Sequence, residues 1–402
     1  MKHLIFILLC ILALTGCSTK STTGSSSNPT NDSIKNIRTD PVVIDITKTP
    51  EKILVLEKIA NIEYIPLETN DSTLVNRPRP DIVSDRYIIY QNNNGQILVF
   101  NRKGKSLYSF NRRGGGPEEY STIYSSIILD EEKDELFIED IHKAKIFVYS
   151  IDGQFKRKLA LPKKFFPDCL MNYDKDYLFC YNVYYLDHTE ESGAIMNQED
   201  YRKRDNPYFF ISKQTGEITP LNYYIPNRTG NKANEMKNGQ RTALLSIGIF
   251  PLTQNTPNIM ITEHADDTIY SLKDRKLIPI MIKNPSTHKM DPPMLLGVDF
   301  FTDRYISLLA CKKEFQERIS AINIIYDKQS DEFYRLATRL PISFPMKGGN
   351  ISLPRNTGLC RITPEKLLKD YNDGKLEGEL KEIASKLKED DNPVLMLIKF
   401  KE

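Results

Sequence analysis

The strongest constraint on the fold is a strand–turn–strand pattern that repeats along the chain. The segments ILVFNRKGKSL (97–107) and IFVYSIDGQFK (146–156) align without a gap, with Gly104 and Gly153 in register. Looser copies begin at Tyr208, Asp267 and Ile322. Because each copy alternates apolar and polar residues around a turn, each predicts a β-hairpin. Hairpins that recur about every 50 to 60 residues predict a repeated all-β unit.

Each hairpin is preceded by one or two further strand-like runs, which makes about four strands per unit. Four antiparallel strands form one blade of a β-propeller. The sixth unit has to be assembled from both ends of the chain, with residues 392–401 pairing with residues 62–68. We therefore predict an all-β fold, a six-bladed β-propeller of four-stranded blades over residues 41–402, closed by pairing of the N- and C-terminal strands.

Residues 364–388 depart from the strand pattern. Pro364 follows a possible helix N-cap, Thr363, and the residues after it favour helix. The apolar positions of the segment form one stripe, which consists of Leu376, Leu380, Ile383 and Leu387. We predict a small helical insertion in the last blade. It either packs on the blade or binds a partner, and the sequence leaves both open.

The N-terminus reads as a bacterial lipoprotein signal. A basic start is followed by the apolar run 4–14 and then by Leu14-Thr15-Gly16-Cys17, too short a run to span a membrane as a helix. The last four residues resemble a lipobox. The resemblance implies that residues 1–16 are a signal peptide and that the Cys17 thiol carries a diacylglyceryl group, with the new amino group usually acylated, which anchors the chain to a membrane. The alternative is an ordinary signal peptide with a chance cysteine.

Residues 18–36 are almost all small or polar and cannot bury an apolar core, so residues 17–40 are predicted to form a flexible tether. Nineteen such residues reach roughly 25 Å. No acidic cluster follows Cys17, although some surface-exported lipoproteins carry one there. We therefore expect an outer-membrane lipoprotein that faces the periplasm in preference to the cell surface.

The charge balance excludes nucleic acid as an expected partner. The net charge is +2, with both signs interspersed along the chain, so no basic stripe points to phosphate backbones.

Cys169 and Cys180 are symmetric about Asp174-Lys175, and a hairpin turning there would set them opposite each other. They are either a disulfide of an oxidising compartment or two reduced cysteines.

The loop NRRGGGPEEY (111–120) invites a phosphate-binding interpretation, but it lacks the required pattern. No Gly-Lys-Ser/Thr follows Gly114, and Glu119 stands where a Rossmann loop has its third glycine. Carboxylates at Glu118 and Glu119 would also repel a phosphate. The loop instead lies where a propeller chain crosses from one blade to the next.

Three motifs resemble a known family. GGGPEEY (114–120) resembles the G-x-GPGEY signature of six-bladed β-propeller lipoproteins of Gram-negative gut bacteria. ADDTIYSL (265–272) and DDNPVLMLIKFK (390–401) are similar to further marks of that family. The sequence departs from the signature at Glu118, where the family commonly has glycine. The resemblance implies a fold and a location, and for most members no activity is assigned.

Crossover loops can line the mouth of a propeller's central channel, where ligands bind. We therefore take Arg113, Glu119 and Tyr120 as candidate binding residues at a channel-mouth loop. In the alternative interpretation, Glu119 accepts backbone hydrogen bonds and Tyr120 packs between blades.

No catalytic motif stands out. The histidines lack metal-ligand spacing and no G-x-S-x-G elbow is present, so no cofactor is predicted. Glu139, Asp140 and Asp299 could supply oxygens for a calcium ion of a lactonase-like hydrolase. Tyrosines in YNVYYLDH (181–188) could stack on a sugar. The leading prediction is a non-catalytic binding, scaffold or sensor module with an envelope protein partner. The hydrolase and a glycan- or peptide-fragment-binding module are the alternatives.

Overall fold

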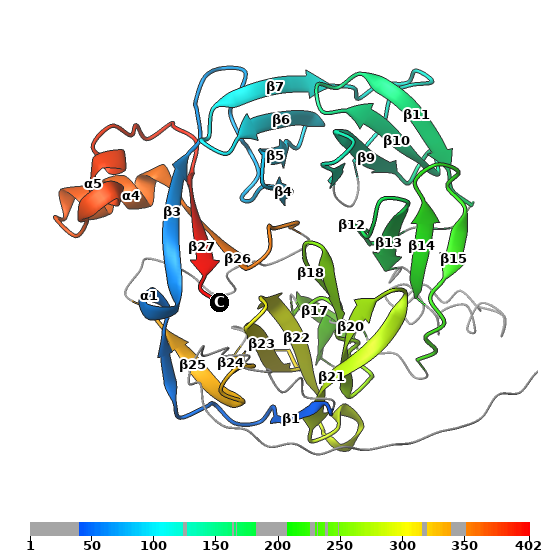
Figure 1. The fold of residues 1–402 in the computed structure, drawn as a ribbon, viewed down its shortest axis with the longest axis vertical. Helices are drawn as coiled ribbons and strands as arrows, with labels where there is room; N and C mark the ends of the chain where they lie inside the picture. Colours follow the sequence, from blue (N-terminus) through cyan, green and yellow to red (C-terminus); the bar gives the residue numbers. More distant parts are fainter. Residues whose placement is uncertain are drawn as a thin grey trace, which may run out of the picture. The chain divides into compact units, whose positions relative to one another are not determined.

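The computed structural model describes residues 40–123, 127–162, 165, 167–181, 207–225, 230, 232–237, 240–247, 249–315, 320–338 and 351–402. The predicted signal peptide (1–16), Cys17 and most of the predicted tether lie outside them. The described residues form six sheets arranged as the blades of a β-propeller, which confirms the predicted fold (Figure 1). No helix among them is long and apolar enough to cross a membrane.

Blades 1 to 3 have four strands each, in order from the innermost strand outward. Blade 1 contains β4 (Ile82–Val83), β5 (Tyr87–Gln91), β6 (Gln96–Asn101) and β7 (Ser106–Asn111). Blade 2 contains β8 (Ile127–Asp130), β9 (Glu135–Asp140), β10 (Lys145–Ser150) and β11 (Phe155–Ala160). Blade 3 contains β12 (Cys169–Asn172), β13 (Tyr177–Tyr181), β14 (Tyr208–Ser212) and β15 (Ile218–Pro220). The central strands of each blade are buried on both faces, because neighbouring blades pack against them.

Blades 4 to 6 depart from the predicted four strands. Blade 4 contains β18 (Leu252–Asn255), β19 (Asn258–Ile261), β20 (Thr268–Lys273), β21 (Lys276–Asn284) and, outermost, β1 (Val42–Asp45). Blade 5 contains β22 (Met294–Phe301), β23 (Tyr305–Lys312), β24 (Ala321–Asp327), β25 (Glu332–Ala337) and β2 (Ile53–Val55). Blade 6 contains β26 (Thr357–Ile362), β27 (Val394–Phe400) and β3 (Ala60–Pro66). A separate hairpin joins β16 (Lys232–Lys237) to β17 (Gln240–Ser246).

The N-terminal part of the propeller runs along the rim of three successive blades. β1 pairs in parallel with β21, β2 pairs in parallel with β25, and β3 enters blade 6 after the short helix α1 (Leu56–Ile59). We call this segment, residues 42–66, the strap; it is drawn in blue in Figure 1. Because β1 and β2 cover the outer edges of blades 4 and 5, they remove two open strand edges.

The ring closes by the predicted pairing of chain ends. β3 pairs antiparallel with β27 along its whole length, from Ala60 opposite Phe400 to Pro66 opposite Val394. Asn392, shortly before β27, is buried, and both the nitrogen and the oxygen of its side-chain amide form hydrogen bonds. Its Nδ2 donates to the carbonyls of Glu68 and Thr73 at 2.8 Å each, and its Oδ1 accepts from the Val75 N–H at 2.9 Å. The C-terminal strand therefore holds the segment that leads from β3 into blade 1.

The predicted helical insertion is present and consists of two short helices. α4 (Pro364–Asn372) begins at the predicted N-cap, since the Thr363 hydroxyl accepts from the Lys366 N–H. The chain then turns through Gly374, at φ +68°, and α5 (Gly378–Ala384) follows. A positive φ is open to glycine at little cost, which explains the break. The short 3-10 helix η1 (Thr287–Lys289) lies between blades 4 and 5.

The glycines of the sequence repeat make contacts between blades. A Cβ on Gly104, in the β6–β7 turn, would lie 2.0 Å from the carbonyl oxygen of Pro66 in β3. A Cβ on Gly153, in the β10–β11 turn, would lie 2.4 Å from the Phe110 ring of blade 1. Both residues also have a positive φ. Each hairpin turn thus packs against the outer strand of the preceding blade, and only glycine permits that approach.

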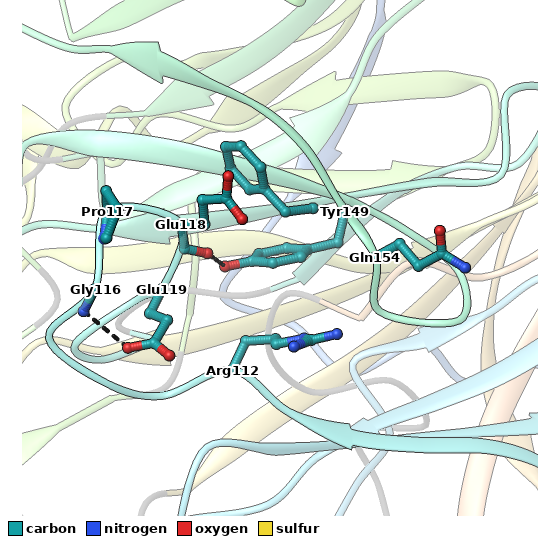
Figure 2. A pocket seen from close by; sticks show the side chains of 8 residues that line it. Arg112, Gly116, Pro117, Glu118, Glu119, Tyr149 and Gln154 are labelled. Atoms are coloured by element: carbon teal, nitrogen blue, oxygen red, sulfur yellow. Dashed lines mark hydrogen bonds between the residues drawn. The ribbon is translucent and has the colours of Figure 1, made fainter.

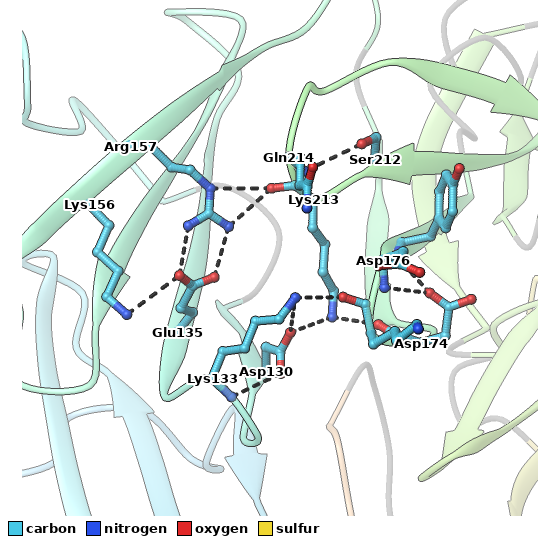
Figure 3. A network of polar contacts seen from close by, with 12 residues as sticks. Asp130, Lys133, Glu135, Lys156, Arg157, Asp174, Asp176, Ser212, Lys213 and Gln214 are labelled. Carbon is cyan, nitrogen blue, oxygen red and sulfur yellow. Dashed lines mark hydrogen bonds and ion pairs between the residues drawn. The ribbon is translucent and has the colours of Figure 1, made fainter.

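A buried ion pair joins blades 2 and 3, as Figure 3 shows. Lys213 Nζ lies 2.7 Å from Asp130 Oδ2, and both side chains are almost fully buried. The ammonium also donates to the Asp174 carbonyl at 2.6 Å. Burial lowers the pKa of Lys213. Beside this pair, Arg157 forms two hydrogen bonds with Glu135, at 2.7 and 2.8 Å.

Cys169 and Cys180 form no disulfide, which corrects that alternative. Cys169 faces Tyr181 across the β12–β13 pair, and Leu170 faces Cys180. The register is thus one residue away from the symmetric one that the sequence suggested. Because side chains alternate between the faces of a sheet, the two buried thiols point to opposite faces.

Replacing Asn392 by Ala tests the closure. The change leaves one backbone N–H and two carbonyls without their partner, so we expect the free energy of unfolding in urea to fall by about 3 kcal/mol. The control is Asn61→Ala, an exposed asparagine of β3, which should change stability by less than about 0.5 kcal/mol. Equal effects of the two substitutions would contradict the role given to Asn392.

The Lys213–Asp130 pair predicts non-additive effects on stability. Lys213→Met or Asp130→Asn alone leaves one buried group without its partner and should cost about 3 kcal/mol. The double variant should cost clearly less than the sum of the two single variants, because neither charge remains. Lys156→Ala, at the half-exposed partner of Glu135, is the control and should cost under about 1 kcal/mol. Additive losses in urea unfolding would show that the pair does not act as a unit.

Candidate functional site

The glycine-rich loop 111–120 is closed by its own backbone. The Gly114 N–H donates to the Tyr120 carbonyl at 2.9 Å, and the Tyr120 N–H donates to the Arg112 carbonyl at 3.2 Å. The Glu119 carboxylate accepts from the Gly116 N–H at 2.8 Å. A Cβ on Gly114 would meet this carboxylate at 2.1 Å. The glycines therefore let the backbone fold tightly around the Glu119 side chain.

The loop is folded around a cation from another turn. Lys143, between β9 and β10, places its ammonium against three loop carbonyls, at 2.7 Å from Glu119, 3.3 Å from Gly116 and 3.4 Å from Gly114. A phosphate-binding loop turns its N–H groups inward, whereas this loop turns its carbonyls inward. The electrostatic polarity is thus the opposite of a nucleotide site.

The three residues that the sequence suggested for binding, Arg113, Glu119 and Tyr120, all form hydrogen bonds within the protein. Tyr120 is fully buried, and its hydroxyl donates to the Gly95 carbonyl at 2.6 Å and accepts from the Arg112 N–H at 3.1 Å. Burial raises the pKa of Tyr120 to about 12, so the phenol stays neutral. The Arg113 Nε donates to the Ser121 carbonyl at 3.0 Å. These contacts match the structural alternative stated for Glu119 and Tyr120.

A hollow of about 340 Å³ opens beside the loop, and Figure 2 shows its walls. We use the hollow for the space lined by Arg112, Gly116, Pro117, Glu118, Glu119, Tyr149, Gln154 and Phe155. The buried Tyr149 ring forms part of its wall, and the Tyr149 hydroxyl donates to the Glu118 carbonyl at 2.5 Å. The Arg112 Nε donates to the Gly153 carbonyl at 2.9 Å. Of the three candidates, only Glu119 lines the hollow.

The hollow lies toward the rim and not at the mouth of the central channel, which corrects the expected position. Its walls come from the loop after β7 and from β10 and β11, the outer two strands of blade 2 (Figure 1). The innermost strands β4 and β8 contribute no residue to it. The crossover chain packs against the outer half of the next blade before it turns inward.

The interior of the ring is crossed by main chain. The Val83 N–H of β4 donates to the Ser352 carbonyl at 2.9 Å, and the Thr256 N–H, after β18, donates to the Leu353 carbonyl at 3.2 Å. The Asn255 Nδ2 donates to the Phe301 carbonyl of β22. Blades 1, 4 and 5 are thus joined through these residues near the ends of their innermost strands.

The acidic residues considered for calcium do not converge. Asp140 accepts from the Ser121 N–H and hydroxyl with one oxygen, at 2.6 and 2.7 Å, and from the backbone of His142 and Lys143 with the other. Glu139 lies in β9 and Asp299 in β22. Across the described ranges, no three His, Cys, Asp or Glu side chains gather in a way that could hold a metal ion.

The other quoted motifs hold blades together. Asp266 of ADDTIYSL accepts from the Tyr223 hydroxyl at 2.5 Å and from the Thr268 N–H at 2.8 Å. Asp267 accepts from the Thr287 N–H at 3.0 Å and lies 3.9 Å from the buried Lys283 ammonium. Burial lowers the pKa of Lys283 to about 8. Tyr181 is buried, and the rest of the tyrosine-rich stretch, residues 182–188, lies outside the described residues.

Sequence reasoning missed the residues that shape the hollow. Arg112 comes from the loop after β7, Tyr149 and Gln154 come from the β10–β11 hairpin, and Lys143 comes from the turn between β9 and β10. The sequence carried one signal for the hairpin residues. Gly153 aligns with Gly104, and this alignment marks the β10–β11 turn, next to Gln154, as a contact between blades. No pattern in the sequence marks Lys143.

Comparisons with known proteins agree with the fold. A crystal structure of a Bacteroides fragilis protein inferred to be exported matches with 18% identity and a TM-score of 0.59, over 90% of this chain and 99% of that chain. A Bacteroides vulgatus member of the DUF4221 family matches with 11% identity and a TM-score of 0.45, over 69% of this chain and 84% of that chain. No protein with a curated description matches the chain.

A family model described as a domain of unknown function, DUF4934, matches residues 41–399. This range spans the propeller from the first strand of the strap to the last strand of blade 6. The chain therefore belongs to the DUF4934 family.

Proposed function

We propose that the protein is a lipoprotein of the bacterial cell envelope whose propeller acts as a non-catalytic binding and scaffold module. In this proposal Cys17 carries the lipid anchor at the periplasmic face of the outer membrane. The hollow is the contact site for an envelope protein. The lipobox-like sequence and the similarity to an inferred exported protein support the location.

The observation that carries the proposal is the display of two opposite charges, on Arg112 and Glu118, at the edge of the hollow. The Arg112 side chain makes its one described hydrogen bond through Nε, which leaves both terminal nitrogens of the guanidinium for a ligand. The Glu118 carboxylate makes no hydrogen bond within the described ranges, since only its carbonyl is bonded, to Tyr149. Both residues are exposed.

Such a surface suits recognition better than chemistry. Arginine is among the side chains that most often dominate protein interfaces. The loop holds the surface rigidly, because the Lys143 ammonium and the Glu119 carboxylate fix its backbone. A rigid contact site loses little conformational entropy on binding. The hollow opens at the rim, where a large partner can reach it.

The anchor is tested by replacing Cys17 with Ser. We expect the full chain to move from the membrane fraction to the soluble fraction and to lose the mass of its acyl groups, because the thiol that carries the lipid is gone. Cell fractionation and intact-mass spectrometry measure both changes. A variant that stays in the membrane with an unchanged mass would exclude lipidation at this cysteine.

The contact site is tested by photo-crosslinking in intact cells. With a benzophenone amino acid at position 154, an exposed position that lines the hollow and leaves Arg112 and Glu118 in place, the protein should give one dominant crosslinked partner. Arg112→Ala should reduce the yield at least fivefold, equivalent to about 1 kcal/mol of binding energy. Arg113→Ala is the matched control, because this neighbouring arginine does not line the hollow. An equal loss in both variants, or no crosslink in either, would overturn the proposed site.

A further inference from the structure

Blade 6 differs from the other blades in its outer part. It has three strands, and in the described part of the chain α4 and α5 pack beside β3 where other blades have a fourth strand (Figure 1). Leu380 and Ala384 of α5 are buried in a cluster that includes Ile62 and Tyr64 of β3. The helical pair is therefore held against the outer strand of blade 6.

A groove of about 440 Å³ runs between α5 and the end of β3. We use the groove for the space lined on its apolar side by Pro66, Leu67, Ile383 and Leu387. Ile383 and Leu387 are only partly buried, although their neighbours in the predicted apolar stripe are covered by the blade. The groove volume lies within the range of pockets that bind ligands.

The polar side of the groove is acidic. Glu379, Glu382 and Asp391 line it together with one basic residue, Lys386. Asp391 caps the turn after α5 by accepting from the Lys388 N–H at 2.7 Å. Glu379 and Glu382 are exposed, and their carboxylates make no hydrogen bond or ion pair within the described residues. The groove thus joins an apolar floor to an excess of unpaired negative charge.

We propose that the groove docks a basic, extended segment of a partner protein, with an apolar side chain on the floor and lysine or arginine beside Glu379 and Glu382. This inference rests on the proposed function, because it names the kind of partner that a scaffold would hold. The charges favour such a segment over an acidic one, since like charges across an interface oppose binding. Carboxylates at the groove also repel anionic lipid headgroups, which argues against a membrane surface as the occupant.

The segment should bind weakly and in a salt-dependent manner. Exposed ion pairs are screened within about 8 Å at physiological ionic strength, so affinity should fall as salt is added. The apolar contact on Leu67, Ile383 and Leu387 should persist. The carboxylates therefore select basic sequences, and the apolar contact with the groove determines where the segment binds.

A random peptide library tests the proposal without a known partner. Phage-displayed peptides of about twelve residues are selected on the full chain that carries Cys17→Ser, which keeps the ring and removes the anchor. Enriched peptides should carry at least two basic residues around an apolar one. Their retention should fall at least tenfold on the variant Glu379→Lys with Glu382→Lys, a loss that corresponds to about 1.4 kcal/mol.

The matched control is Glu389→Lys with Asp390→Lys. These exposed residues lie between α5 and β27 and do not line the groove, and the double substitution makes the same change of charge. This control should retain the peptides within twofold. Enrichment without basic residues, equal losses in both variants, no enrichment at all, or groove-dependent binding to phosphatidylglycerol vesicles would each overturn the proposal. If the crosslink at position 154 persists while the selection fails, only the groove is excluded. If both fail, the scaffold function is excluded as well.

Discussion

The whole fold depends on the antiparallel pairing of β3 with β27. A ring of blades has no terminal caps, so each blade buries its faces only if the first and last units meet. The pairing joins residues more than 300 positions apart, and Asn392 then ties the start of the last strand to the segment entering blade 1. Without this contact, blade 6 would keep two strands and the faces between blades 6 and 1 would open to water.

The ring could be predicted because its signals are local and repeated. Alternating hairpins with glycines in register identified the blades, and Thr363 and Pro364 identified the start of the helical insertion. The predictions that were wrong concerned the register of strand pairing and the number of strands per blade, which a periodic sequence pattern does not determine. The turn between β12 and β13 shifts the pairing by one residue, which sends Cys169 and Cys180 to opposite faces. β1 and β2 are too short for a sequence to show which edge they cover.

The candidate site was less predictable, because its geometry arises between distant segments. Interactions of Glu119 and Tyr120 could be argued from the loop alone. The cation inside the loop comes from Lys143, and the walls of the hollow come from the hairpin of the next blade. Buried lysines such as Lys213 are equally hidden, since nothing in a sequence separates a lysine that pairs across blades from one in solvent. Such contacts become visible only when the ring brings its turns together.

The strap has a mechanical consequence. Any pull on the chain ahead of residue 40 reaches β1 first, then β2, and only afterwards β3. The two parallel strands each add a short ladder of hydrogen bonds that must break before the closing strand bears load. β1 and β2 therefore bear an applied force before β3 does, and they protect the closing pair of strands. A pull that breaks only these two pairings leaves β3 paired with β27, and the ring stays closed.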